Sequence, residues 1–419
     1  MTFGGRFPDE ARHLFDTVAE MSRDTAGVSR PAFSLTETRV LEFLRDWAQG
    51  HGLHVEQDAG HNLLFCLPRD AAAGQFVLVG SHVDSVPQGG NFDGLAGVVA
   101  GLLCLLRARD AAPLPRPLKA IAMRGEESAW FGPCYIASKC LTGTITEAEL
   151  DAQHKSDGKT LEAHMQAIGI DTAPVRARRP LMRTERIVEY IEVHIEQGPL
   201  LVNKKLPAAV VSGIRGNFRH RAINCIGEAG HSGAVPRAYR RDPVLALSDL
   251  LTRLDESWST ILQKGDDLVL TCGMLSTDPA HHALSRIADR VTFSLDIRSQ
   301  SDGVLDRMRA LVRDEMNRVA RERKVRFEPD AEIATPPAMM NDRIVAGLSA
   351  AMGLSGLAPF VMASGGGHDA AVFANAGVPS GMVLVRNTNG SHNPDEAMDV
   401  EDFLIACEIV FRHLQQGDG

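Results

Sequence analysis

The stretch Phe76-Val77-Leu78-Val79-Gly80-Ser81-His82-Val83-Asp84 decides the fold, because a nearly continuous apolar run turns abruptly into polar residues. Such a run predicts a strand that helices cover on both faces. Residues 94–106, rich in Gly, Ala, Val and Leu, predict a closely packed buried helix, and residues 118–123 predict a second strand. Strand, helix and strand in this order are typical of a doubly wound α/β layer.

Segments on either side extend this layer. Residues 35–50 have apolar residues at helical spacing, closed by Gly50, and two more strands are predicted at 187–193 and 381–385. A different pattern begins near residue 213 and ends near 329. Its expected elements are strand 219–226, helix 242–254, strand 268–274, a strand ending at Arg298 and helix 304–323. We therefore expect a mostly parallel α/β domain, residues 1–212 and 330–419, interrupted by an inserted α+β domain, residues 213–329.

Composition excludes several classes of protein. The 419 residues are 44% hydrophobic and 23% charged, which is typical of a globular chain. A net charge of −9 with 5% aromatic residues disfavours a nucleic-acid partner. No stretch approaches the ~20 apolar residues of a membrane helix, and no apolar leader is visible, so we expect no membrane partner. Seven scattered cysteines without a CxxC pair indicate buried free thiols in a reducing cytoplasm.

Polar clusters follow each of the four predicted strands of the α/β layer. In chain order they are His82 with Asp84, Glu126 with Glu127, His194, and His392. In doubly wound sheets the ligand crevice lies outside the carboxyl ends of the strands. We therefore expect the four clusters to converge on one site. A single histidine would more often be a satisfied polar group, but a full set at four strand ends is not explained in that way.

The residue types in these clusters indicate a metal site. Histidine and carboxylate without cysteine suit Zn²⁺, Mn²⁺ or Co²⁺. His82 and Asp84 share a face of an extended chain, so Asp84 can accept the second ring N–H of His82. Adjacent Glu126 and Glu127 point in different directions, so one can bind metal while the other acts as a base.

Six motifs in the same order carry a resemblance to a known family. They are residues 80–94 (GSHVDSVPQGGNFDG), Glu126-Glu127, residues 194–198 (HIEQG), His231-Ser232-Gly233, residues 367–370 (GHDA) and residues 391–394 (SHNP). Over roughly residues 30–405 the chain resembles the hydantoinase/carbamoylase family of M20-type dinuclear metallohydrolases. This resemblance implies an α/β catalytic domain, and a lid and dimerisation role for the inserted domain. It also implies a homodimer.

The resemblance also implies roles for single residues. Two divalent ions per chain (Zn, Mn or Co) would be held by His82, Asp93 and His194, and by Asp93, Glu127 and His392. Glu126 would be the general base, and Asp84, as the partner of His82, is a further catalytic candidate. His231 would reach the developing oxyanion from its own or the neighbouring subunit. The residues implied in substrate binding are Gln197, Arg298, Ser285, Gly366, Trp130 and Arg386.

Three substrate-site residues depart from the family pattern. Trp130 stands where the family commonly has Arg, Ser285 where it usually has Asn, and Arg386 where Pro is more usual. Ser285 is shorter than Asn, while Trp130 and Arg386 add an apolar wall and a cation. We therefore expect a small-molecule substrate that is bulkier or more anionic than N-carbamoyl glycine or alanine.

The expected activity is metal-dependent hydrolysis of a non-peptide C–N bond in a small carboxylate-bearing molecule, above all an N-carbamoyl-L-amino acid or ureido acid. One alternative is another M20-type hydrolase, namely an amidase, a dipeptidase or aminoacylase, or a hydrolytic deaminase of an unusual amine. A second alternative, a non-catalytic binding protein, is disfavoured because Glu126 and every implied metal ligand are present.

Overall fold

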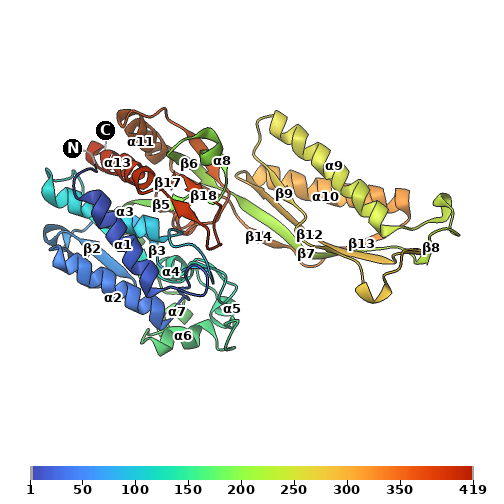
Figure 1. Cartoon of the computed structure of the whole chain (residues 1–419), viewed down its shortest axis with the longest axis horizontal. Helices are drawn as coiled ribbons and strands as arrows, with labels where there is room; N and C mark the ends of the chain where they lie inside the picture. Colours follow the sequence, from blue (N-terminus) through green and yellow to red (C-terminus); the bar gives the residue numbers. More distant parts are fainter. Residues whose placement is uncertain (1–2, 418–419) are drawn as a thin grey trace. The chain divides into compact units, whose positions relative to one another are not determined.

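The apolar run that begins at Phe76 forms the centre of the larger of two compact units in the computed structural model, which describes residues 3–417. Unit 1 comprises Met1–Ile214 and Met339–Gly419, and unit 2 comprises Arg215–Ala338 (Figure 1). The expected boundary at 329/330 falls inside unit 2. The reason is that strand β14 (Ile333–Thr335) pairs with β7 (Gly216–Ile226) of that unit.

Unit 1 is built on a mixed sheet that has nine strands within the described residues. Its order is β1-β2-β4-β3-β5-β17-β6-β15, with β16 beside β6. The strands are β1 (His54–Gln57), β2 (Leu63–Cys66), β3 (Phe76–His82), β4 (Leu118–Met123), β5 (Ile187–Ile195), β6 (Ala208–Ile214), β15 (Ala338–Met339), β16 (Val361–Ser364) and β17 (Ser380–Val385). Strands β4, β3, β5 and β17 run parallel, which confirms the predicted doubly wound α/β fold.

Helices cover both faces of this sheet, so every residue of β3, β4 and β17 is buried. One hydrophobic cluster contains residues of α1 (Phe7–Met21), α2 (Leu35–Gly50), α3 (Leu95–Asp110), α11 (Asp342–Leu354) and α13 (Val400–Gln416). Another contains residues of α4 (Ile136–Thr142), α5 (Glu147–Leu150), α6 (Leu161–Ala167) and α7 (Ala173–Arg176). The remaining short helices are α8 (Leu200–Lys204) and α12 (Asp369–Asn375). Within residues 3–417, no helix combines the length and apolarity that a bilayer span requires.

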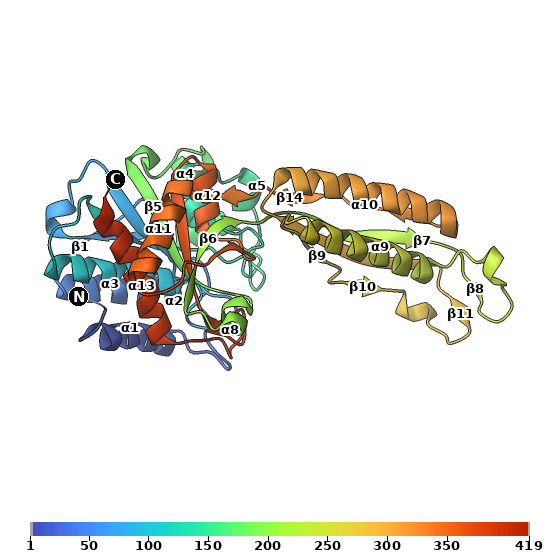
Figure 2. The same cartoon turned by 90° about the horizontal axis from the view of Figure 1, so that it is seen from above.

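Unit 2 is an antiparallel sheet with two long helices on one face (Figure 2). Strands β7 and β12 (Arg290–Ser299) form its centre, flanked by β9 (Val269–Thr271), β10 (Leu275–Ser276), β13 (Arg326–Glu328) and β14. Alternate residues of β12 are buried against helices α9 (Pro243–Gln263) and α10 (Asp302–Arg323). Helix α9 begins after Asp242, which accepts the Val244 and Leu245 N–H groups, and it extends beyond the predicted end at 254.

Candidate metal centre

The polar residues predicted at the four strand ends lie together in unit 1. His82 is the last residue of β3, and His194 lies next to the last residue of β5. Glu126 and Glu127 follow β4, and His392 lies in the loop between the short paired strands β18 (Asn387–Thr388) and β19 (Ala397–Met398). Two groups of potential ligand atoms result, namely His82, Asp93 and His194, and Asp93, Glu127 and His392. Parallel strands bring their carboxyl ends to one edge of the sheet, as predicted.

Asp93 is the residue that the two groups share. Its Oδ1 lies 3.0 Å from His194 Nε2 and 3.5 Å from His82 Nε2, and its Oδ2 lies 3.6 Å from His392 Nε2. Glu127 Oε1 lies 3.3 Å from His392 Nε2. Gly94 follows with φ +68°, and a Cβ there would lie 2.3 Å from the His82 ring. Glycine is therefore required for the chain to pass His82 this closely.

The donor set fits divalent metal ions. His82 Nε2 is buried without a hydrogen-bond partner although it faces the carboxylates of Asp93 and Glu126. A buried ring nitrogen rarely stays unpartnered. His82 Nδ1 lies 3.1 Å from the Asp84 carbonyl oxygen, an arrangement that directs Nε2 toward the carboxylates. Histidine nitrogens and carboxylate oxygens around a shared carboxylate are ligands that Zn²⁺ and Mn²⁺ accept.

Asp84 connects this cluster to the Glu126–Glu127 pair. Its Oδ1 accepts the Glu126 backbone N–H at 2.9 Å, and its Oδ2 accepts the Glu127 backbone N–H at 3.0 Å. Asp84 Oδ1 also lies 3.3 Å from His82 Nδ1. Asp84 therefore fixes the backbone of both glutamates as well as the histidine that sequence reasoning assigned to it.

Burial and mutual charge set the protonation of the cluster. Burial raises the pKa of Glu126 well above its usual value, and the charge of Glu127 raises it further. A hydrogen bond with Glu127 raises the pKa of His392 to about 9. Burial alone would raise the pKa of Asp93, but His194 and His82 hold it well below its usual value. Glu126 is thus a carboxyl group with raised proton affinity, which a general base requires.

Two of the predicted substrate residues lie at this cluster. The Gln197 side-chain amide donates to Asp93 Oδ2 at 2.9 Å, and its nitrogen lies 3.3 Å from His392 Nε2. Gly366 packs against Gln197 so closely that a Cβ at this position would lie 2.0 Å from Gln197 Oε1. Gly366 therefore leaves the space that the Gln197 side chain occupies.

Two other predicted substrate residues have structural partners. The indole of Trp130 is buried and donates to the Ser85 carbonyl oxygen at 2.8 Å. The Arg386 guanidinium donates to Asp402 at 2.7 Å, at the start of α13. Both side chains therefore have hydrogen-bond partners within unit 1 that help to hold its fold together.

Sequence reasoning missed two buried glutamates that hold the site in place. Glu396 Oε1 accepts the backbone N–H groups of Phe92 and Asp93 at 2.8 and 3.2 Å. Glu37 on α2 accepts the Gly125 N–H at 3.1 Å and pairs with Arg124 at 2.6 Å. Glu396 was detectable as the acidic residue shortly after His392, whereas nothing local in the sequence links α2 to residue 125.

His231 and Ser285 lie side by side at one end of unit 2. Strand β8 (Gly230–His231) pairs with β11 (Arg286–Ile287), and the Ser232 N–H donates to the Ser285 carbonyl oxygen at 2.8 Å. Both residues are exposed. The Gly233 N–H donates to His231 Nδ1 at 3.2 Å, so Nε2 is the ring nitrogen free to carry hydrogen in the neutral imidazole.

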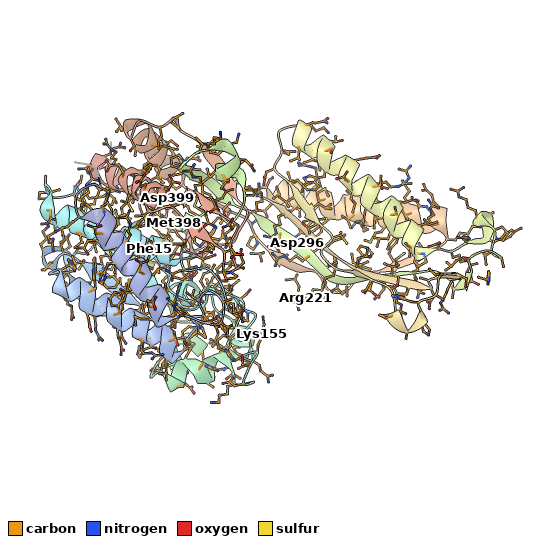
Figure 3. All side chains as sticks on the ribbon, viewed as in Figure 1. Phe15, Lys155, Arg221, Asp296, Met398 and Asp399 are labelled. Carbon is orange, nitrogen blue, oxygen red and sulfur yellow. The ribbon has the colours of Figure 1, made fainter. Side chains whose placement is uncertain are left out.

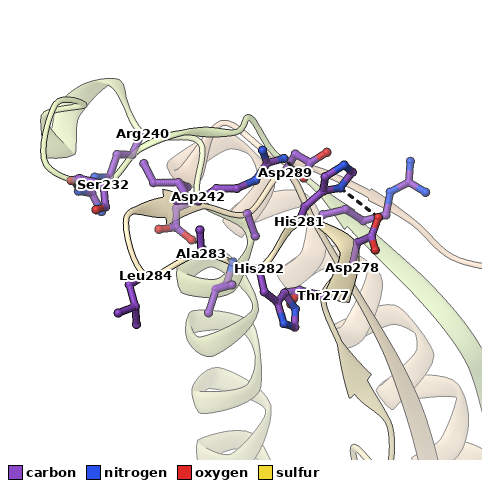
Figure 4. Close-up of a pocket in the computed structure, with 15 residues that line it drawn as sticks. Ser232, Arg240, Asp242, Thr277, Asp278, His281, His282, Ala283, Leu284 and Asp289 are labelled. Atoms are coloured by element: carbon purple, nitrogen blue, oxygen red, sulfur yellow. Dashed lines mark hydrogen bonds and ion pairs between the residues drawn. The ribbon is translucent and has the colours of Figure 1, made fainter.

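A pocket of about 600 Å³ opens beside these residues within unit 2. Figure 4 shows its lining, including Ser232, Asp242, Leu284 and the ion pair of His281 with Asp278. The Leu284 side chain is fully exposed. This end of unit 2 thus offers polar and apolar groups that residues 3–417 of one chain leave open to solvent.

Arg298 lies on β12 of the six-stranded sheet, which is separate from the two-stranded sheet of β8 and β11. It is in register with Asn217 on β7. Its guanidinium pairs at 2.7 Å with Asp296, which is labelled in Figure 3. The nine residues of β12 from Arg290 to Arg298 span roughly 25 Å at the rise of a strand. Strand β9 pairs with β12 at Arg298, and β8, which ends at His231, lies toward the other end of unit 2 (Figure 2).

Comparisons with known proteins agree with this architecture. The model of peptidase family M20/M25/M40 matches residues 78–416. The chain belongs to peptidase family M20/M25/M40. Within this M20 family it is 30% identical to the N-carbamoyl-L-amino acid amidohydrolase of Geobacillus stearothermophilus, over 94% of each chain. It is 32% identical to the allantoate amidohydrolase of Escherichia coli K12, over 93% of each chain.

A solved structure of the same group has the same fold. An amidase of the hydantoinase/carbamoylase family from Burkholderia multivorans superposes with a TM-score of 0.86 at 27% identity, over 97% of each chain. The resemblance to the hydantoinase/carbamoylase family is therefore confirmed, and this M20 chain is a hydrolase.

Proposed function

We propose that this protein is a metal-dependent amidohydrolase that cleaves a ureido C–N bond in a small carboxylate-bearing molecule, above all an N-carbamoyl-L-amino acid. The observation that carries the proposal is the position of Asp93, whose two oxygens face two separate ligand groups. A carboxylate shared in this way suits a pair of divalent ions, Zn²⁺, Mn²⁺ or Co²⁺. His82, Asp93 and His194 would hold one ion, and Asp93, Glu127 and His392 the other.

The residues of the cluster would have different roles in the hydrolysis. Such a pair of ions, when bound, lowers the pKa of a water molecule and polarises a carbonyl oxygen. Glu126 takes the proton of the attacking water and returns it to the leaving nitrogen. Burial raises the pKa of Glu126, which favours the step in which it accepts a proton. Asp84 keeps Glu126 in position through the backbone bond of 2.9 Å.

The names of the relatives support the substrate class. One relative is named for N-carbamoyl-L-amino acids and another for allantoate, and both names denote amidohydrolases. Arg298 would hold the substrate carboxylate, since a guanidinium matches a carboxylate by two parallel hydrogen bonds. Its present partner is Asp296, so substrate would compete with or join that ion pair. Gln197 and Gly366 would border the substrate beside Asp93. Trp130 and Arg386 would influence the shape of the substrate pocket by packing in its walls.

We further propose that the active form is a homodimer in which His231 serves the site of the neighbouring subunit. Arg298 and His231 of one chain lie toward opposite ends of β12, whose span of roughly 25 Å is beyond the reach of a small substrate. If both residues touch one substrate, they come from different subunits. His231 Nε2–H would then donate to the developing oxyanion, with Ser285 beside it.

An exposed apolar surface on unit 2 supports this dimer. Val244 and Leu245 on α9 and Met274 and Leu275 at β10 are between 42% and 61% exposed. A pocket of about 460 Å³ lies between α9 and β10. Within residues 3–417, β10 ends the path of its sheet, so its outer edge would be available to pair with a second copy about a twofold axis. Unit 2 would thus act as the dimerisation and lid domain.

A substrate screen tests the proposed activity. Protein reconstituted with Zn²⁺, Mn²⁺ or Co²⁺ is assayed with N-carbamoyl-L-amino acids, ureido acids, N-acyl amino acids and dipeptides. Ammonia release from the ureido compounds supports the proposal, and Glu126→Gln protein provides the inactive control. Release of two amino acids from a dipeptide, with no ammonia from ureido compounds, would replace it with a peptidase function.

All seven cysteines are free, which suits the cytoplasmic location we propose.

A further inference from the structure

A third group of potential metal ligands in unit 1 shares no residue with the candidate metal centre. It consists of His154, Asp157 and His164, and one ligand atom of each lies within 4.8 Å of the others. Asp157 Oδ1 lies 3.2 Å from His164 Nε2 and 3.5 Å from His154 Nδ1. The two imidazole rings lie side by side, with their centroids 4.8 Å apart.

These spacings fit a tetrahedral zinc ion. Zinc bonds of about 2.0–2.2 Å to nitrogen and oxygen place neighbouring tetrahedral ligand atoms about 3.3 Å apart. The observed separations of 3.2 and 3.5 Å agree with that value. Two imidazoles and one carboxylate also suit Cu²⁺ and Ni²⁺, but not Mg²⁺ or Ca²⁺, which prefer oxygen ligands.

The three side chains are held ready by the local fold. Residues 153–160 form a turn in which the His154 N–H donates to the Lys159 carbonyl oxygen at 2.8 Å. The Lys159 N–H donates to Asp157 Oδ1 at 3.0 Å. The Ser156 N–H donates to His154 Nδ1 at 3.3 Å, a long hydrogen bond that a metal ion bound at this nitrogen would displace. Thr160 then caps α6, the helix that carries His164. Figure 3 labels Lys155, which lies in this turn.

Exposure and charge suit capture of a cation from solvent. The side chains of His154 and His164 are only 10% and 19% exposed, whereas that of Asp157 is 39% exposed. The carboxylate of Asp157 is thus the most exposed of the three groups and faces solvent, from which an ion would enter.

Aromatic rings join this cluster to the segment that follows Glu126 and Glu127. The Trp130 ring stacks parallel to that of His154 with centroids 5.9 Å apart. The Phe131 ring meets His154 and His164 edge-on at 5.0 and 5.2 Å. The Trp130 carbonyl oxygen also accepts the Lys155 N–H at 3.0 Å.

We propose that His154, Asp157 and His164 form a further metal site that binds Zn²⁺ independently of the candidate metal centre. The bound ion ties the 153–160 turn to α6 and fixes the ring of His154 against Trp130. The proposal rests on this cluster alone and does not depend on the proposed catalytic activity.

The test is a calorimetric titration of metal-loaded protein with Zn²⁺, accompanied by thermal unfolding with and without the added ion. Wild-type protein is expected to take up one additional zinc per chain and to unfold at a higher temperature, because the ion binds only the folded state. His164→Ala is expected to lose this binding step. Asp157→Asn should weaken zinc binding by roughly tenfold or more, because even the loss of a residue that only supports a metal ligand commonly costs 10- to 100-fold in metal affinity.

His281→Ala is the matched control, because His281 is an exposed histidine paired with Asp278 at 3.1 Å and belongs to unit 2. It should leave zinc uptake unchanged. Far-UV circular dichroism checks that each variant is folded, and His164→Gln replaces His164→Ala if the latter is not. Equal zinc uptake by wild-type and His164-substituted protein, or no additional step in wild-type protein, would overturn the proposal and leave a hydrogen-bonded His–Asp–His cluster.

Discussion

Asp84 accepts the backbone N–H of Glu126 at 2.9 Å, so the proposed general base is held by a carboxylate that is not among the proposed metal ligands. The second Asp84 oxygen accepts the Glu127 N–H at 3.0 Å. Asp84 is completely buried, so water cannot replace either bond. The positions of the proposed base and of one proposed ligand therefore depend on a single side chain.

Asp84→Asn is expected to lower kcat and metal affinity together, each by roughly 10- to 100-fold, because the amide offers one acceptor where the carboxylate offers two. Steady-state kinetics and metal content measure the two effects. Asp330→Asn is the matched control. Asp330 also accepts two successive backbone N–H groups, of Arg221 and Ala222, but it belongs to unit 2. Unchanged kcat in Asp84→Asn would show that the backbone keeps its position without the carboxylate.

Glu126→Gln should lower kcat by roughly 10²–10⁴ while metal stays bound. His231→Ala should lower kcat by roughly 10²–10³ if its N–H stabilises the oxyanion. When the two inactive variants are mixed and exchange subunits, a mixed dimer has one intact site if His231 acts across the interface. Activity should then return to at most about a quarter of the wild-type value. No recovery, with subunit exchange demonstrated, would assign His231 to its own subunit's site.

Arg298→Lys is expected to lower kcat/KM at least ~10-fold for a carboxylate substrate, because an ammonium cannot make the paired hydrogen bonds of a guanidinium. The matched carboxamide substrate should show little change. Arg219→Lys provides the control, since Arg219 also contacts Asp296, at 3.2 Å, from the neighbouring strand. Equal losses for carboxylate and carboxamide would indicate that Arg298 acts only through the ion pair with Asp296.

Metal affinity at the ligand group with Glu127 should rise with pH up to about 9. His392 has its pKa raised to about 9 by its hydrogen bond with Glu127, so metal-free protein keeps this ring protonated at pH 7. Metal must displace that proton, which costs up to about tenfold in affinity for each pH unit below the pKa. Mn²⁺ binding between pH 6.5 and 9 measures the slope, and His392→Gln should reduce it by about one proton. An unchanged slope would exclude His392 as a ligand.

Glu189 gives a separate prediction for stability. Burial alone would raise its pKa, but hydrogen bonds from His413 and Arg116 lower it to about 2. Because the folded-state pKa lies below the unfolded value, the stabilisation is complete above pH ~4.5 and is lost as pH falls toward 2. Glu189→Gln should lower the free energy of unfolding at pH 7 by up to about 3 kcal/mol.

Urea unfolding between pH 3 and 7 tests this prediction, because the difference between wild type and Glu189→Gln should shrink below pH 4.5. Glu185→Gln is the control, since Glu185 forms an exposed pair with Arg183 just before β5. A difference that stays constant with pH would mean that the ionised carboxylate of Glu189 is not what stabilises unit 1.

Much of the fold could be predicted because its signals are local. Helix α2 was expected over 35–50 and β4 over 118–123, and both have these bounds. The capping Ser34 and the spacing of apolar residues determine α2 without reference to distant segments. The ends of α9 and β9 were less well predicted, since packing in unit 2 decides how far each continues.

The sequence by itself determined the strand ends and the chemistry placed there, because side-chain type and apolar runs are properties of neighbouring residues. It thereby indicated the convergence of His82, Glu127, His194 and His392. Only the tertiary structure decided which partners each side chain has. Asp84 turned toward the Glu126 backbone, Glu396 came to support Asp93, and His154 and His164 met across Asp157. Some of these contacts join segments that are remote along the chain, and the others depend on the direction in which a side chain points. No local sequence pattern specifies either kind.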